Sequence, residues 1–171
     1  MSRAFVRESD SSSLPELPPL ASPLPPGAKN LLTPGGARQL REELARRLEH
    51  ERPRLATAPA DDLDAKRELQ VLDQRIRYLQ ESLRTAEIAT IAPGPAEVVS
   101  FGATVAVREK DGVVTSYRIV GVDETDLDRN WISWLSPLAR ALINGRVGDR
   151  VQFKAPRGVR ELEIVAIAGE P

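Results

Sequence analysis

The sequence predicts an α+β protein in which an antiparallel α-helical coiled-coil hairpin precedes a small antiparallel sheet with one helix. Between residues 31 and 91, leucine and isoleucine recur at spacings of three and four, which is typical of a helical seam. From residue 97 onward, short runs rich in β-branched residues alternate with turns that contain glycine, which is typical of strands. The first thirty residues fit neither pattern.

Residues 1–30 hold several of the 14 prolines of the chain, in the pattern LPELPPLASPLPPG. A stretch this rich in proline and serine cannot bury a core, so we expect a disordered or polyproline-like tail that adds little stability. Near its start, RAFVRE places Phe5 and Val6 between two arginines. This short stretch is either a docking peptide or an exposed pair without a role.

Residues 31–91 are predicted to form the hairpin. Thr33 before Pro34 is a helix-start signal, because the hydroxyl can cap free amides and the proline ring presets φ. Pro53 is expected to kink the first helix or remove one backbone hydrogen bond without ending it. The apolar side of this helix consists of Ala37, Leu40, Leu44 and Leu48. The second helix, KRELQVLDQRIRYLQESLRTAEI, carries the seam Leu69, Leu72, Ile76, Leu79 and Leu83. The two seams are expected to be buried against each other.

Three carboxylates lie where the two helices meet, in the stretch ADDLDAKREL: Asp61, Asp62 and Asp64. Like charges this close together repel one another, so we expect either the local backbone or a binding partner to interact with these carboxylates. Asp61 is predicted to cap the second helix, and Asp64 is predicted to lie at its third position. There both carboxylates would stabilise the free amides of the first turn and the positive end of the helix dipole. This structural interpretation accounts for two of the three carboxylates without any function.

Residues 97–171 are predicted to form a second domain. The runs ATVAVRE and VVTSYRIVG are strands joined by a turn at 110–112. A short strand about WISW follows, and then a helix capped by Ser136, begun by Pro137 and stopped by Asn144-Gly145. The runs VGDRVQFKA and RELEIVAIA supply two more strands. The expected result is a twisted antiparallel sheet packed on one helix.

Composition excludes several classes of function. The 24 basic and 25 acidic side chains nearly cancel, so no polybasic field takes the chain to nucleic acid by itself. The sequence has no cysteine, which excludes disulfides and thiolate metal sites, and His50 has no second imidazole with which to share a metal. No apolar run is long enough to cross a bilayer or to serve as a signal peptide. We therefore expect a cytoplasmic protein.

Several blocks resemble the bacterial Gre transcript-cleavage factors. FGATVAV, YRIVGVDE and ISWLSPLARALINGRVGDRV follow one another in the order and spacing of their C-terminal domain. LLTPGGARQLREEL and ERP resemble the start of their coiled coil, and RIRYL is more similar to the GreB branch than to GreA. The resemblance covers about residues 31–170 and leaves the proline-rich tail outside.

This resemblance implies a function as well as a fold. The C-terminal domain would be FKBP-like and would bind the rim of the RNA polymerase secondary channel, while the coiled coil passes down that channel. Acids at the tip would help to hold a Mg²⁺ shared with the polymerase active centre, so that polymerase hydrolyses backtracked RNA. Mg²⁺ takes only one or two carboxylates, so the factor needs no pocket, no cofactor of its own and no enzymatic activity. We expect a monomer that meets nucleic acid only within the transcription complex.

The resemblance is weakest at the tip, where the family has an Asp and a Glu three positions apart. One register places Asp62 and Ala65 on these positions, and the next places Asp61 and Asp64 there, as expected metal ligands. Each arm is also about five or six residues shorter than in the family, which corresponds to about 8 Å. The alternative function is therefore a regulator that occupies the channel without cleavage and competes with longer Gre factors.

The resemblance also implies a partner-binding surface made of Trp134, Leu135, Ser136, Pro137 and Leu138. The Ser-Pro pair matches the rim-contacting residues of the family, while Leu135 stands where GreB-like sequences have an Asp. Trp131 and Trp134 lie at strand spacing. They belong either to the sheet core or to an exposed apolar patch for the partner.

Overall fold

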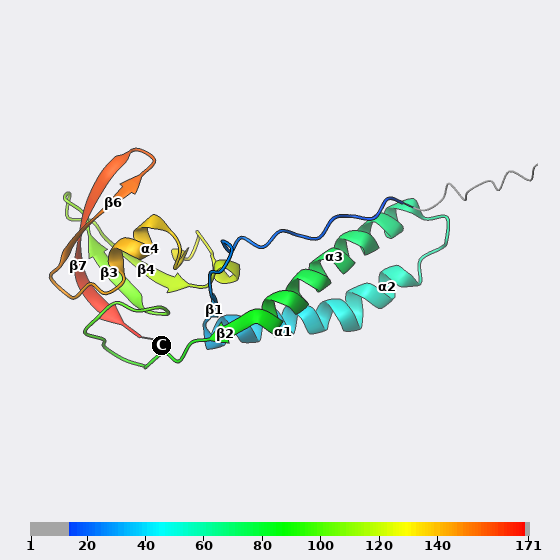
Figure 1. Ribbon diagram of the computed structural model, residues 1–171, viewed down its shortest axis with the longest axis horizontal. Helices are drawn as coiled ribbons and strands as arrows, with labels where there is room; N and C mark the ends of the chain where they lie inside the picture. Colours follow the sequence, from blue (N-terminus) through cyan, green and yellow to red (C-terminus); the bar gives the residue numbers. More distant parts are fainter. Residues whose placement is uncertain (1–13, 170–171) are drawn as a thin grey trace, which may run out of the picture.

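The computed structural model describes residues 14–169, and Figure 1 shows a long helical arm beside a small sheet domain. The helical arm has two sides. One side consists of α1 (Pro34–Arg46), η1 (Arg47–Glu51) and α2 (Arg52–Ala56), and the other is α3 (Leu63–Thr85). Within residues 14–169, no helix is both long and apolar enough to cross a membrane. The stretch RAFVRE lies outside the described residues, so its two interpretations stay open.

The first side of the arm begins as the sequence predicts. Thr33 Oγ1 accepts a hydrogen bond from Gly36 N at 3.0 Å, and Pro34 is the first helical residue. The helix continues through Pro53, as expected, but a π-helical turn precedes this proline. The wider turn relieves the clash that the proline ring would make with the carbonyl of Glu49. The elements are α1 (Pro34–Arg46), η1 (Arg47–Glu51) and α2 (Arg52–Ala56).

The second side of the arm is α3 (Leu63–Thr85). The helix was predicted to run on to Ile88, but residues 86–88 are extended instead. The apolar seam is confirmed where the two sides share a core, which includes Leu40 and Leu79. The inclusion of Leu48 in the seam is wrong, since this residue is 40% exposed. The π-helical turn changes the angle between successive side chains and so rotates Leu48 away from α3.

A short parallel pair of strands closes the base of the arm. Strand β1 (Asn30–Leu32) enters α1 and β2 (Ala86–Ile88) leaves α3, with Asn30 opposite Ala86 and Leu32 opposite Ile88. The buried Asn30 amide also donates to the carbonyl of Ser82 at 2.9 Å. The two ends of the arm are therefore fixed to each other before the chain reaches the sheet domain.

The sheet domain contains five strands in the order β5-β4-β3-β7-β6. The strands and the predicted turn at 110–112 are confirmed, but the sheet is not wholly antiparallel, because β5 pairs with β4 in parallel. Residues 121–130 cross over between these two strands, as a parallel connection requires. The bounds are β3 (Thr104–Arg108), β4 (Val114–Val120), β5 (Trp131–Ser133), β6 (Arg150–Ala155) and β7 (Gly158–Ala168).

One helix, α4 (Pro137–Leu142), covers the sheet as predicted. It buries Ala139 and Leu142 against a core that the central strands supply. Asn144 has a positive φ of 71°, which ends the helix where the sequence predicts. The core side chains from the strands include Val105, Val107, Ile119, Leu162, Ile164 and Ile167.

The arm and the sheet domain meet at the 3₁₀ turn η2 (Val122–Glu124). The Glu124 carboxylate is 8% exposed and accepts hydrogen bonds from Thr33 N at 2.9 Å, from Thr33 Oγ1 and from Gly121 N at 3.0 Å. The helix side contributes Tyr78, whose hydroxyl donates to Asp123, and Ser82, whose hydroxyl donates to the same carboxylate at 2.6 Å. We call these contacts the joint.

Residues 14–29 lie along α3 and run from near the arm's tip toward β1, so we call them the strap (Figure 1). The strap forms no helix or strand, in agreement with its proline content. Residues 14–29 belong to the stretch for which we expected a disordered or polyproline-like tail, and side chains of α3 bind the backbone of this part. The carbonyls of Pro15 and Pro18 accept these bonds.

Candidate functional site

The tip of the arm is the turn between α2 and α3. Asp62, and not Asp61, caps α3: its carboxylate accepts a hydrogen bond from Ala65 N at 2.9 Å. The helix starts one residue later than predicted because the turn across 59–62 is closed by a hydrogen bond from Asp62 N to Pro59 O at 3.0 Å. This shift places Asp64 at the second helical position and leaves Asp61 outside the helix.

The three tip carboxylates therefore differ in their surroundings. Asp64 lies 3.5 Å from Arg67, although its side chain is 91% exposed. Asp61 is exposed and has no hydrogen bond or ion pair within the described residues 14–169. One carboxylate caps the helix, one faces an arginine, and Asp61 alone keeps both oxygens free for a partner.

The tip does not form a metal site by itself. Within the described part of the chain, no group of three or more acidic or imidazole side chains could hold a metal ion. A Mg²⁺ needs only one or two protein carboxylates when other groups complete its octahedron.

The predicted partner-binding residues lie together at the start of α4. Ser136 Oγ accepts from Ala139 N at 3.1 Å, which confirms the cap, and Pro137 is exposed beside it. Leu138 and Trp134 are half-buried and pack on the sheet core. Leu135 is also half-buried, and its amide donates to Ser133 Oγ at 3.2 Å. Pro137 is the most accessible member of this group.

The two tryptophans have different environments. Trp134 packs on the sheet core, which favours the first of its two interpretations. Two guanidinium groups lie over the Trp131 ring, Arg118 at 5.0 Å and Arg129 at 5.2 Å from its centroid. Trp131 is therefore a half-buried residue whose ring makes two cation–π contacts, and it is neither a buried core residue nor a bare apolar patch.

A network of charges joins the two sides of the arm. Arg75 on α3 donates to both oxygens of Glu43 on α1, at 3.0 and 3.1 Å, and Arg47 donates to the same carboxylate at 2.9 Å. Burial alone would raise the pKa of Glu43, but these arginines outweigh it and the pKa lies below its usual value. The arm is thus held together by charge as well as by its seam.

Comparison with known proteins decides the family. The protein family described as "Transcription elongation factor, GreA/GreB, C-term" matches residues 94–169 of this chain. Transcription elongation factor GreB of Neisseria meningitidis serogroup B is 38% identical over 152 residues, which cover 81% of this chain and 93% of that protein. The chain belongs to the GreA/GreB family. GreA of Brucella anthropi is 37% identical and covers 80% and 95% of the two chains. The crystal structure of GreA factor homolog 1 from Thermus thermophilus is 29% identical, with a TM-score of 0.40 and coverage of 83% and 100%.

In this Gre-family chain, sequence reasoning missed the joint. Asp123 and Glu124 follow strand β4 after Gly121 and Val122 and were not singled out, although two acids shortly after an apolar strand are a signal of helix or turn capping. Burial and the hydrogen bond to Asp123 raise the pKa of the Tyr78 hydroxyl, so this hydroxyl stays a donor. Gly36 leaves room for Glu124, since a Cβ there would lie 2.0 Å from its Oε1. The joint sets the direction of the arm relative to the sheet domain.

Proposed function

We propose that this Gre-family chain binds RNA polymerase at the secondary channel and stimulates the hydrolysis of backtracked RNA by polymerase. The sheet domain docks on the channel rim through the surface around Ser136 and Pro137, and the arm carries the tip toward the active centre. The observation that carries the proposal is Asp61, an exposed carboxylate at the end of the arm opposite the sheet domain that has no hydrogen bond or ion pair with any of residues 14–169.

The chemistry requires little of the factor. When bound, a second Mg²⁺ stabilises the attacking oxygen of an in-line phosphoryl displacement. Asp61 would supply one carboxylate oxygen to that ion, with Asp64 as the second expected ligand. Asp62 keeps the start of α3 ordered by capping it, so the free acid is presented by a rigid turn. The chain brings an acid and polymerase performs the reaction.

The non-cleaving regulator remains the second candidate function. It is favoured by the engagement of Asp62 and Asp64 within the tip itself, which leaves one fully free carboxylate. Such a factor would occupy the channel and displace longer Gre factors without supplying a complete acid pair.

A cleavage assay on a stalled, backtracked elongation complex tests the two functions. We expect the unmodified chain to accelerate RNA cleavage and the D61N/D64N variant to lose this effect while its affinity for polymerase is unchanged. Asn retains a side-chain oxygen but loses the anionic charge that Mg²⁺ requires. D128N, an exposed change in the sheet domain, is the matched control. Displacement of a longer Gre factor without cleavage by the unmodified chain would establish the second function instead.

A further inference from the structure

The outer face of α3 binds the strap through side-chain amides. Gln70 Nε2 donates to the carbonyl of Pro15 at 3.2 Å, and Gln74 Nε2 donates to the carbonyl of Pro18. Because the two glutamines are four residues apart, they lie one above the other on the same helix face. They form a ladder of two donors for an extended chain.

The strap presents the acceptors that such a ladder needs. Each proline lacks an N–H, so a proline-rich stretch makes no internal ladder and leaves its carbonyls available. The strap also carries Glu16, which lies 3.8 Å from Arg77 on the same face of α3. The side-chain amides thus bind backbone carbonyls of the strap. The ion pair between Glu16 and Arg77 adds a preference for an acidic residue in the bound segment.

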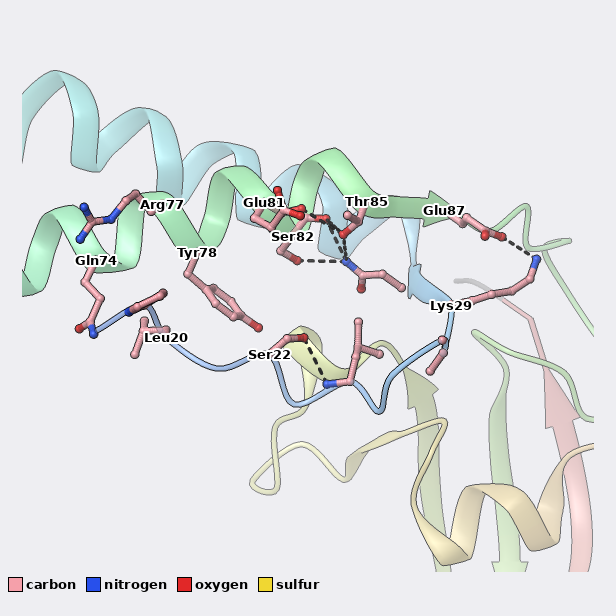
Figure 2. Close-up of a pocket in the computed structure, with 15 residues that line it drawn as sticks. Leu20, Ser22, Lys29, Gln74, Arg77, Tyr78, Glu81, Ser82, Thr85 and Glu87 are labelled. Carbon is pink, nitrogen blue, oxygen red and sulfur yellow. Dashed lines mark hydrogen bonds and ion pairs between the residues drawn. The ribbon is translucent and has the colours of Figure 1, made fainter. Parts of the chain in front are cut away.

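A cavity of about 650 Å³ lies between the second half of the strap and α3. Figure 2 shows Tyr78 and Gln74 extending from α3 toward the strap, with Leu20 and Ser22 on the opposite wall. Proline-rich peptides dock in grooves lined by aromatic side chains, and Tyr78 supplies one aromatic ring to this cavity. The strap spans this cavity without filling it.

We propose that the outer face of α3 is a receptor for an extended proline-rich peptide, and that residues 14–20, LPELPPL, occupy it in cis. The attachments are exposed or partly buried hydrogen bonds and one exposed ion pair, which are individually weak. Because the strap is joined to the arm by a short stretch of chain, its local concentration at α3 is on the order of millimolar. The strap therefore stays bound although its individual contacts are weak. The receptor therefore exchanges the strap for a peptide of the same pattern at comparable concentration.

Nuclear magnetic resonance of the full chain tests this receptor. The sequence has no cysteine, so A21C gives a single attachment point for a nitroxide on the exposed side of the strap. We expect the nitroxide to abolish the amide signals of α3 near residues 74–78. A synthetic peptide, SSLPELPPLASPL, should restore those signals in a saturable manner at millimolar concentration. The same peptide with alanine in place of its prolines should restore them far less.

Two variants separate the ladder from general effects on the helix. Q70A/Q74A should restore the α3 signals without any peptide, since alanine keeps the helix and removes both donors. Q80A, an exposed glutamine of α3 away from the strap, should behave like the parent. The proposal is overturned if the parent shows no broadening, if Q70A/Q74A leaves it unchanged, or if the peptide has no effect at ten times the strap's local concentration. Broadening that passes from a labelled molecule to an unlabelled one would overturn the assignment in cis.

Discussion

At the scale of single residues, the three tip carboxylates are chemically alike but structurally unequal. Asp62 is fixed by Ala65 N, Asp64 lies near Arg67, and Asp61 has neither constraint. An acid that must approach a metal in another protein is more effective when no intramolecular partner competes for its oxygens. The free carboxylate should therefore dominate any activity of the tip.

We predict that D61N alone reduces stimulated RNA cleavage more than D62N or D64N alone. Asn at position 62 retains the helix cap, so D62N removes charge without fraying α3. Initial cleavage rates of the three variants in one backtracked complex give the comparison, with polymerase affinity measured in parallel. Equal losses for all three would show that the tip acts through its summed charge.

A second prediction concerns Gly36, where α1 touches the joint. G36A should lower the stability by about 1–3 kcal/mol, because the new Cβ displaces the buried Glu124 carboxylate. This cost outweighs the gain in helix propensity, which is about 1 kcal/mol. Urea unfolding measures it. In the E124A background the clash is absent, and G36A should become neutral or stabilising. The same loss in both backgrounds would contradict the assigned cause.

At the scale of elements, most of the order of helices and strands could be predicted from the sequence. Thr33-Pro34 and Ser136-Pro137 carry local capping chemistry, and the strands carry their own alternation, so these elements were placed correctly. The parallel pairing of β4 and β5 could not be predicted, because it depends on the path of residues 121–130. The position of the strap was missed for a similar reason: proline content excludes a core but does not exclude binding to the side chains of a neighbouring helix.

The candidate site was predictable in composition but not in detail. The acids of the tip and the Ser-Pro turn were found by their residue types. The identity of the capping acid could not be predicted, because Asp stands at both position 61 and position 62. A shift of one residue in the turn decides between them. The joint was missed because its partners, Thr33, Tyr78 and Asp123, are far apart along the chain.

The charge network between α1 and α3 predicts how the arm responds to acid. The pKa of Glu43 is lowered in the folded state, so its contribution to stability is complete above the pKa of the unfolded chain. That contribution is lost as the pH falls through the folded pKa. We expect the free energy of unfolding to decrease below about pH 4.5, and the decrease to be smaller in E43Q. Denaturant unfolding at a series of pH values measures both slopes, and equal slopes would exclude this carboxylate.

At the scale of the whole molecule, the joint connects the sheet domain, which we propose binds polymerase, to the arm, which carries the tip. D123A removes the acceptor of Tyr78 and Ser82, so the arm should lose its fixed direction relative to the sheet domain. We predict that D123A binds polymerase as well as the parent but supports less RNA cleavage. Binding by fluorescence anisotropy and cleavage on the same complexes provide the two readouts, with D128A as control. A parallel loss of binding would place Asp123 in the docking surface itself.

The parallel pairing of β1 and β2 allows the length of the arm to change without a change in the rest of the fold. Since Asn30 and Ala86 are neighbours, both chain ends of the arm leave from one place, whatever its length. Whole turns can be added to or removed from both helices without moving that exit or the sheet domain. Evolution, or an engineer, can thus tune the reach of the tip as an independent variable, by grafting helical hairpins of different length onto one unchanged base.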